Sequence, residues 1–254
     1  RIVNSIYCVF SYFYFISAFL QPCKLNDNKC FKDLWHNSIP YLSKGIPELD
    51  MPPLDPMKIT KSVNIKIPNL FDINFIQGHM KGYKSCVVES YKWTDLKKGN
   101  IGADVDFKCN IHIKGRYNAT ASSNLIPGLT SGAPVKADGN VKLNIRNLVD
   151  FHIKLCFFLN EAGEIIVVLK TPIDYKYKVT EPVTFEADKI FLDNQDISPL
   201  VVNLLNSGWR YIIDTYGRPF FDETMKLVGD VEKTFFSHVP ASKFIADDLE
   251  PYVQ

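Results

Sequence analysis

Residues 197–239 read ISPLVVNLLNSGWRYIIDTYGRPFFDETMKLVGDVEKTFFSHV. Apolar side chains recur along this segment at steps of three and four residues, which is the spacing of one face of an α-helix. Asp196 or Ser198 can cap the start of such a helix, and Pro199 suits its first turn. An unbroken helix of about 40 residues would be about 60 Å long. The segment therefore predicts a long C-terminal helix along which the rest of the chain packs.

Three residues within this segment argue against a straight helix: Gly208, Gly217 and Pro219. Pro219 lacks the N–H group of one main-chain hydrogen bond, so it is expected to bend or split the helix near Tyr216. We interpret the segment as one long bent helix. Two consecutive helices are the alternative.

The totals for the chain limit the possible functions. It has 254 residues, of which 46% are hydrophobic, and a formal net charge of +1. This length suits one large domain or two small ones with a substantial core. The near-neutral charge argues against a nucleic-acid partner, because phosphate binding needs an excess of clustered Lys and Arg.

The N-terminal segment differs from the rest of the chain, since residues 2–20 are apolar and uncharged. They resemble the hydrophobic part of a secretory signal peptide, and we expect cleavage between Ala18 and Pro22. A membrane anchor is the alternative, for which the segment is barely long enough. We predict a signal peptide at residues 1–21, incomplete because it has no initiator Met. Residues 22–254 are then a single secreted, extracellular domain without stable membrane insertion.

The cysteines fit an oxidising compartment. Beyond residue 21 the chain has five of them: Cys23, Cys30, Cys86, Cys109 and Cys156. Cys23 and Cys30 flank a short polar loop and are predicted to form a local disulfide. Cys86 and Cys109 could face each other in a hairpin that turns near residues 97–100, and the odd number leaves at least one free thiol. The absence of Cys-x-x-Cys spacing and the scattered histidines predict no metal site.

Between residues 31 and 56 the sequence predicts a short helix and a rigid connector. Phe31, Leu34, Trp35 and Leu42 have helical spacing, and Gly45 is a typical stop signal. The prolines of residues 47–56 then favour an extended chain.

From residue 57 to residue 193 the apolar period changes to two, as in half-buried strands. The runs are residues 63–67, 71–75, 105–113, 141–145, 151–159, 165–169 and 183–190. Turns are predicted at Gly99-Asn100, Gly139-Asn140 and residues 161–163. The fold class is therefore α+β: a strongly curved antiparallel sheet wrapped around the long C-terminal helix, with the short N-terminal helix beside it.

Residues 118–120, Asn-Ala-Thr, form a glycosylation sequon. In a secreted protein such a triplet at the polar side of a strand predicts a modified Asn118.

Several motifs resemble the insect takeout and juvenile-hormone-binding-protein family. They are Pro22-Cys23-Lys24 with Cys30, Gly45-Ile46-Pro47-Glu48-Leu49, Pro52-Pro53-Leu54-Asp55-Pro56, Gly139-Asn140-Val141-Lys142-Leu143-Asn144-Ile145 and Leu205-Asn206-Ser207-Gly208-Trp209. The resemblance spans residues 22–245. It implies a secreted protein in which an internal tunnel, between helix and sheet, holds a lipophilic small molecule. Hormone-binding members carry a second disulfide later in the chain. Cys86, Cys109 and Cys156 do not match that pattern cleanly, so the resemblance is nearer to takeout-like members.

No catalytic signature supports an enzyme. The sequence has no Gly-x-Ser-x-Gly elbow, His-Glu-x-x-His motif or phosphate-binding loop. His112 and His152 fall on the outward rows of their strands, and the paired acids fit solvated faces. We therefore predict a protein that is not an enzyme and uses no cofactor.

The residues expected to line the tunnel lie on the apolar rows of the strands and the long helix. They are Val105, Phe107, Cys109, Ile111, Phe151, Ile153, Phe157, Val201, Leu205, Trp209, Ile212, Tyr216 and Phe220. Tyr216, Cys109 or a nearby Tyr could orient a ligand's polar group. The alternative is that this row fills a solid core.

The predicted function is a secreted carrier of a small lipophilic ligand such as a terpenoid hormone or a fatty acid. A secreted interaction or signalling protein without a ligand is the alternative, and a lipid-acting hydrolase a more distant one.

Overall fold

The computed structural model describes residues 20–125, 132–170 and 172–254, with backbone alone at residues 100, 125 and 147–151. The predicted signal peptide at residues 1–21 thus lies almost wholly outside the described residues. The described strands form one antiparallel sheet in the order β1-β3-β5-β6-β10-β11, to which β2, β4, β7, β8 and β9 add. Their bounds are β1 Met57–Ile59, β2 Val63–Ile67, β3 Phe71–Lys81, β4 Val87–Lys97, β5 Asn100–Ala121, β6 Val135–Leu159, β7 Ile165–Leu169, β8 Asp174–Val179, β9 Thr184–Ala187, β10 Ile190–Leu192 and β11 Gln195–Asp196.

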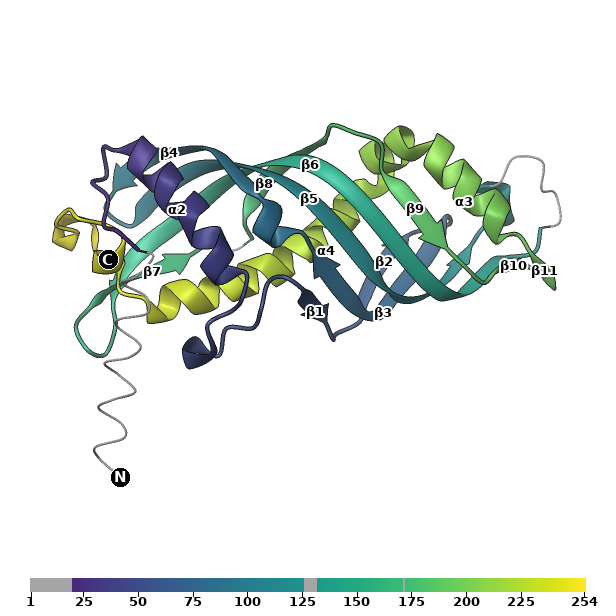
Figure 1. The fold of residues 1–254 in the computed structure, drawn as a ribbon, viewed down its shortest axis with the longest axis horizontal. Coiled ribbons are helices and arrows are strands. Elements are labelled where there is room, and N and C mark those ends of the chain that lie inside the picture. Colours follow the sequence, from purple (N-terminus) through teal and green to yellow (C-terminus); the bar gives the residue numbers. More distant parts are fainter. Residues whose placement is uncertain (1–19, 126–131, 171) are drawn as a thin grey trace, which may run out of the picture.

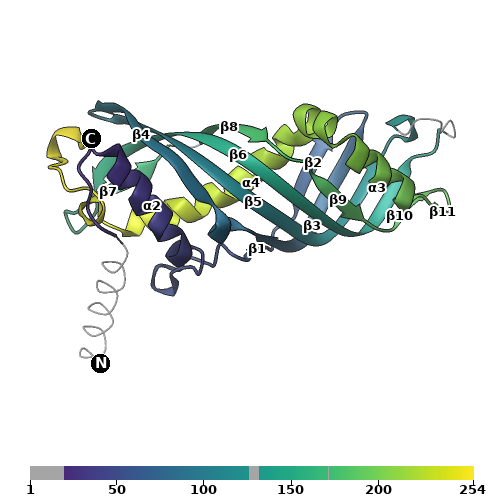
Figure 2. The same cartoon turned by 45° about the horizontal axis from the view of Figure 1, so that its top comes forward.

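Two long strands organise the sheet. β5 and β6 pair without interruption from Ile101–Leu155 to Ala121–Val135. At about 3.3 Å per residue, each extends about 70–80 Å. β3 and β4 pair with β5, and β7, β8, β9 and β10 pair with β6. Figures 1 and 2 show the resulting elongated sheet curving around one long helix, as the sequence predicts.

The helices are α2 (Asn28–Leu42), α3 (Ser198–Ser207) and α4 (Trp209–His238). Short 3-10 helices lie at η1 Pro47–Leu49, η2 Tyr83–Ser85, η3 Ser123–Leu125, η4 Ala241–Lys243 and η5 Glu250–Tyr252. No helix in the described ranges is long and apolar enough to cross a membrane.

The long C-terminal helix is broken at Gly208 and not at Pro219, which corrects the expected site of the break. The Gly208 N–H closes α3 on the Leu204 carbonyl at 2.9 Å, and the Gly208 carbonyl accepts from Ile212 N–H at 3.1 Å. Pro219 lies inside α4. Pro219 removes a single hydrogen-bond donor from this 30-residue helix. Glycine has no side chain to restrict its backbone, so it disfavours helix at Gly208.

Tyrosines of β8 hold α4 against the sheet. The Tyr177 ring stacks on Phe221 with ring centroids 4.0 Å apart, and its hydroxyl donates to the Ile213 carbonyl at 3.3 Å. The Tyr175 hydroxyl donates to Asp222 at 2.6 Å, and the Arg218 guanidinium lies 4.2 Å from the Tyr175 ring centre. These contacts fix the middle of α4 on the concave side of the sheet.

The turn predictions have mixed outcomes. Lys97 pairs with Asn100 in the β4–β5 hairpin, and a turn at residues 161–163 joins β6 to β7, so both are confirmed. The turn at Gly139-Asn140 is wrong, because β6 runs straight through it. Gly139 is needed for close approach: a Cβ there would lie 2.2 Å from Asp188 Oδ1. Asp188 instead accepts from Asn140 N–H at 2.7 Å.

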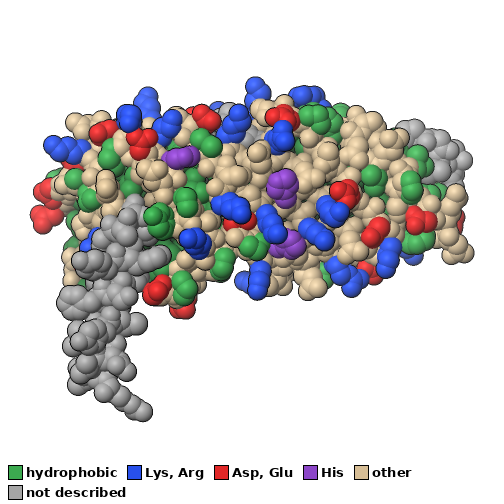
Figure 3. All heavy atoms as spheres, in the orientation of Figure 1, with side chains coloured by type: hydrophobic (Ala, Val, Ile, Leu, Met, Phe, Trp, Pro, Cys, Tyr) green, Lys and Arg blue, Asp and Glu red, His purple; other side chains and the backbone are tan. Residues whose placement is uncertain are grey.

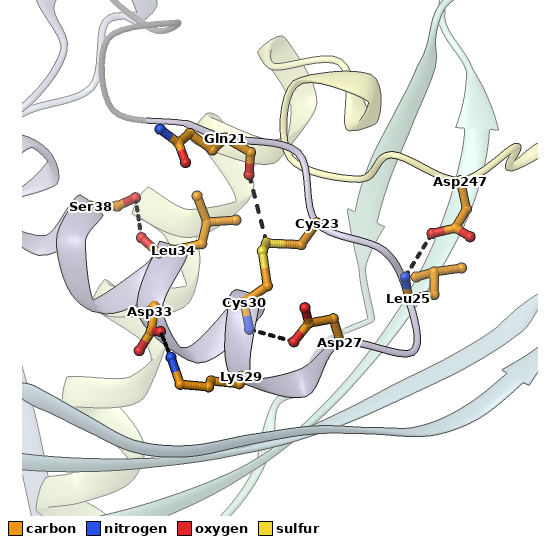
Figure 4. The surroundings of a disulfide bond; sticks show 10 residues. All are labelled: Gln21, Cys23, Leu25, Asp27, Lys29, Cys30, Asp33, Leu34, Ser38 and Asp247. Carbon is orange, nitrogen blue, oxygen red and sulfur yellow. Dashed lines mark hydrogen bonds and ion pairs between the residues drawn. A yellow bond between two sulfur atoms is a disulfide. The ribbon is translucent and has the colours of Figure 1, made fainter.

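The ends of the described chain are joined to each other. Cys23 and Cys30 form the predicted disulfide, and Asp27 caps α2 by accepting from Cys30 N–H at 2.9 Å (Figure 4). Cys23 N–H donates to the Phe244 carbonyl at 3.0 Å, and the Cys23 carbonyl accepts from Ala246 N–H at 2.9 Å. The segment before α2 therefore pairs with the segment that follows α4.

The structure also gives the bonding state of the other three cysteines. Cys86, directly before β4, and Cys109 of β5 form a second disulfide, the pairing that the hairpin allowed. Cys156 is a buried free thiol.

The outer face of the sheet is polar. Lys58, His79, Lys114 and Lys142 stand opposite one another across β1, β3, β5 and β6. Figure 3 shows lysine, arginine and histidine side chains gathered over the middle of this face. The inner face carries the apolar row that includes Val105 and Ile113.

Candidate functional site

A cavity of about 80 Å³ lies inside the end of the molecule that α2 covers. It is enclosed by α2, β4, β5, β6, β7 and the C-terminal half of α4. Its lining is Phe31, Trp35, Ile39, Leu42, Met51, Leu54, Tyr83, Tyr91, Trp93, Ala103, Val105, Phe107, Ile153, Leu155, Val167, Leu169, Val231, Glu232, Phe235, Phe236 and Phe244. Most of these side chains are apolar, and many are aromatic.

Simple sequence periods create this wall. Phe31, Trp35, Ile39 and Leu42 lie on one face of α2 because three or four residues separate each from the next. Ala103, Val105 and Phe107 share one face of β5 because alternate residues of a strand point the same way. Helix and strands thus present their apolar sides to the same space.

Aromatic contacts set the shape of the wall. Phe31 stacks on Tyr91 and meets Trp93 edge-on, with ring centroids 5.2 Å apart in both pairs. Trp35 meets Phe235 and Phe236 edge-on at 6.4 and 5.6 Å. Such pairs each add roughly 0.5–1.5 kcal/mol beyond the burial of their area. α2 and α4 are therefore joined through rings that also line the cavity.

Two residues of the wall carry a polar group that has no partner among the described residues. The Trp93 Nε1–H is buried and makes no hydrogen bond. The Glu232 carboxyl group has no hydrogen bond or ion pair within the described chain, and its burial raises its pKa to about 7. Glu232 is only half-buried by accessible area.

The tyrosines of the cavity are neutral at physiological pH. Burial raises the pKa of the Tyr83 hydroxyl, and the nearby negative charge of Glu232 raises it further. Burial likewise raises the pKa of Tyr91, and a hydrogen bond with Trp35 lowers it by a smaller amount. Glu232 is therefore the one group on the described cavity wall that titrates near neutral pH.

Of the thirteen residues predicted to contact a ligand, Val105, Phe107 and Ile153 line this cavity. Six others pack in or against the hydrophobic clusters of the core: Cys109, Ile111, Phe157, Val201, Trp209 and Phe220. Leu205, Ile212 and Tyr216 are half-buried on α3 and α4, away from the cavity wall. Phe151 lies in β6, but its side chain is outside the described part. Ligand contact by these residues stays a prediction.

The two residues considered for orienting a polar group differ from that expectation. Cys109 is bonded to Cys86, so it has no S–H group to donate. Tyr216 packs edge-on against Phe71 and Tyr211, with ring centroids 5.8 and 6.0 Å apart. Neither residue lies on the cavity wall.

Sequence reasoning missed Glu232 and Trp93. Glu232 lies four residues after Val228 and three before Phe235, so the helical period places its carboxyl group on the apolar face of α4. A charged residue on the apolar face of a predicted helix indicates a candidate functional residue, so the sequence did contain a signal for Glu232. Trp93 follows Tyr91 at the strand period, but nothing in the sequence shows that its N–H lacks a partner.

Asn118, the sequon residue, is exposed on β5 and borders a shallow polar hollow on the outer face. Its glycosylation stays a prediction. In the described ranges no three His, Cys, Asp or Glu side chains are grouped as a metal site.

A family model described as haemolymph juvenile hormone binding protein matches residues 3–246. Among solved structures, Takeout 1 of Epiphyas postvittana has a TM-score of 0.77 at 23% identity, covering 90% of this chain and 100% of that chain. Lipopolysaccharide binding protein has a TM-score of only 0.33 at 14% identity, covering 88% of this chain and 38% of that chain. A search of curated proteins returns no match. Since the family model spans nearly the whole sequence and the Takeout 1 fold agrees, the chain belongs to the takeout and haemolymph juvenile hormone binding protein family.

Proposed function

We propose that this protein is a secreted carrier of a small lipophilic ligand, such as a terpenoid hormone or a fatty acid, and that it acts by burial and not by catalysis. The observation that carries the proposal is the internal apolar cavity between α2, the sheet and α4. Membership of a family named for juvenile hormone binding supports it.

Burial of the ligand supplies the binding free energy. A ligand that hides roughly 300–400 Å² of apolar surface gains about 8–10 kcal/mol. Losses of translational freedom and side-chain order reduce this value, so binding in the micromolar to nanomolar range is expected. The predicted contacts on α3 and α4 lie beyond the cavity. We extend the proposal to a tunnel along α4 that reaches them.

Secretion is supported by the disulfides. Cys23–Cys30 and Cys86–Cys109 are typical of proteins that fold in an oxidising compartment. We propose that residues 1–21 act as a signal peptide and that residues 22–254 form one carrier domain. Many contacts link its two ends, since Cys23 bonds to the segment after α4.

Displacement of a fluorescent fatty-acid analogue, together with native mass spectrometry of the purified protein, tests the carrier function. Ala103 lines the cavity and is 1% exposed, so Ala103→Phe should fill the space and weaken probe binding at least tenfold. Ala162→Phe is the matched control, because Ala162 lies exposed in the β6–β7 turn.

Circular dichroism and thermal melting establish that both variants are folded. A wild-type protein that carries no lipid and binds no apolar probe would contradict the proposal. Equal probe binding by folded Ala103→Phe and Ala162→Phe would show that the probe binds elsewhere.

A further inference from the structure

A polar hollow on the outer face of the sheet surrounds the glycosylation sequon. Its volume is about 900 Å³, which is on the scale of pockets that hold small ligands. β2, β3, β5, β6 and β10 each supply part of its lining. β10 lies at the end of the sheet opposite α2 (Figure 1). The hollow shares no lining residue with the apolar cavity, so it is a separate feature of the molecule.

The strand register gathers polar side chains around Asn118. This residue pairs with Asn74 of β3 on one side and with Asp138 of β6 on the other. Thr120 faces the same way as Asn118, because alternate residues of a strand point to the same side of the sheet. All four residues line the hollow. The acceptor amide and the hydroxyl group of the sequon therefore open onto one polar surface.

Asn118 points away from the apolar interior. Its neighbours Tyr117 and Ala119 pack in the hydrophobic cluster that also includes Val201 of α3. Alternation along β5 then places Asn118 on the outer side, where it is exposed. Asn118-Ala119-Thr120 is the one Asn-x-Ser/Thr triplet in the sequence. A glycan attached at Asn118 would thus begin inside the hollow.

The hollow offers hydrogen-bonding groups to a saccharide. The side chains of Asn74, Thr120 and Lys136 make no hydrogen bond or ion pair with other described residues. An amide and a hydroxyl group both donate and accept, and an ammonium group donates. Sugar hydroxyl and acetamido groups also donate and accept, so they match this set.

Phe191 adds an aromatic surface to the hollow. It is 37% exposed, whereas Ile190 and Leu192 on either side of it are buried. Lys136 pairs with both Phe191 and Thr120, so the two lie two strands apart, or about 10 Å. The C–H face of a sugar ring packs well on the electron-rich face of an aromatic ring. An aromatic ring among hydrogen-bonding groups therefore suits a saccharide.

We propose that Asn118 carries an N-linked glycan that lies in this hollow and is held against the sheet. The first N-acetylglucosamine bonds to the polar side chains beside Asn118, and the second crosses β6 to pack on Phe191. The donor is an oligosaccharide on a lipid diphosphate. Asn118 Nδ2 bonds to the sugar C1 and loses one proton, while the C1–O bond to the diphosphate breaks.

This inference rests on the proposed secretion, because glycan transfer takes place in the secretory compartment. It does not rest on ligand binding, since the cavity and the hollow are separate. The glycan is the occupant that the sequence itself supplies, as the sequon lies in the lining.

Resistance of the glycan to enzymatic removal tests the proposal. Protein secreted from mammalian cells should carry one glycan by intact mass, and peptide N-glycosidase should remove it slowly from the folded protein. Phe191→Ala should raise the removal rate about fivefold or more, because the enzyme acts only on a glycan that has left the hollow. After denaturation, both proteins should lose the glycan at the same rate.

Two controls locate the effect. Tyr211→Ala removes a ring that is 66% exposed and does not line the hollow, so it should leave the removal rate unchanged. The double variant Thr120→Ala, Ala162→Thr moves the single sequon to Asn160, at the β6–β7 turn and outside the hollow. A glycan at Asn160 should be removed about fivefold faster than the wild-type glycan, or more.

Thermal melting gives a second readout. Thr120→Ala abolishes the sequon and should lower Tm by about 2–4 °C. Thr120→Ser keeps the sequon and its hydroxyl group, so it should keep the glycan and the Tm. In the Phe191→Ala background, Thr120→Ala should lower Tm by less than about 1 °C, because the contact with the ring is already absent.

The outcomes are distinct from those of the carrier function. Wild-type protein secreted without a glycan overturns this inference. Equal removal rates for the wild type, Phe191→Ala and the Asn160 control also overturn it, since the glycan then lies free in solvent. Either result leaves the carrier function standing. Failure of the protein to bind any apolar probe contradicts the carrier function and leaves this inference standing.

Discussion

Trp35 of α2 meets Phe236 of α4 edge-on, with ring centroids 5.6 Å apart, and so joins the first α-helix of the described residues to the last α-helix. The same indole contacts Phe235 and Phe244. Trp35→Ala should therefore lower the free energy of unfolding by about 3 kcal/mol, through loss of area and of ring contacts. Urea denaturation measures the change. Leu159→Ala is the control, since Leu159 is 60% exposed and its truncation should change stability by less than about 0.5 kcal/mol.

Glu232 predicts a pH dependence of stability. Its pKa is near 7 in the folded protein and near 4.5 when unfolded, so the folded state binds more protons between these values. The contribution of Glu232 to the free energy of unfolding is therefore complete below about pH 4.5, and it is lost as the pH rises to about 7. Glu232→Gln removes this loss and should be more stable than the wild type at pH 8 by about 2 kcal/mol, allowing for partial solvation in the cavity.

Urea denaturation of both proteins at pH 5 and pH 8 isolates the effect, because all other titrating groups are shared. A stability difference between them that is the same at both pH values would show that Glu232 is not buried as described.

The two glycines within α4 should respond differently to substitution by alanine. At Gly229 a Cβ would make ordinary contact with Ile173 at 3.4 Å, so Gly229→Ala should stabilise by about 0.5–1 kcal/mol through helix propensity. At Gly217 a Cβ would lie 3.2 Å from the Tyr177 hydroxyl, which donates to the Ile213 carbonyl. Because this contact is tight, Gly217→Ala should not show the increase in stability expected for Gly229→Ala. Thermal melting compares them, and equal stabilisation would contradict this packing.

The Cys23–Cys30 disulfide closes a short loop at the start of α2. In the chain-entropy treatment, a loop of this size stabilises by about 2–3 kcal/mol. The double variant Cys23→Ser, Cys30→Ser should lose that amount in urea denaturation. Because Cys23 also bonds to Phe244 and Ala246, the loss should loosen the segment after α4, which hydrogen exchange detects at these amides. Unchanged exchange there would show that the backbone bonds suffice.

Periodic signals in the sequence predicted the framework well. The helical spacing after residue 197 and the strand period of β5 are repeated many times, so local exceptions do not hide them. The position of the helix break was not predictable in the same way. Gly208 and Pro219 both disfavour helix, and the choice between them depends on tertiary contacts such as those of Tyr177 with α4.

Residues whose role depends on one partner far away in the sequence were the hardest to predict. Gly139 is a residue type typical of turns, yet in the structure it leaves room for the close approach of Asp188, which is 49 residues away in the sequence. The candidate site was predicted along α4 near Trp209, whereas the cavity lies toward the other end of that helix. Its position depends on α2, and sequence alone does not show which part of the sheet α2 covers.

The cavity wall is assembled from both extremes of the polypeptide, since Phe31 comes from α2 and Phe244 follows α4. During translation α2 emerges from the ribosome long before α4, so the cavity cannot close until almost the entire chain has been synthesised. Under the proposed carrier function, only a finished chain can therefore enclose a ligand, and a chain truncated before Phe244 leaves this part of the cavity wall open to water.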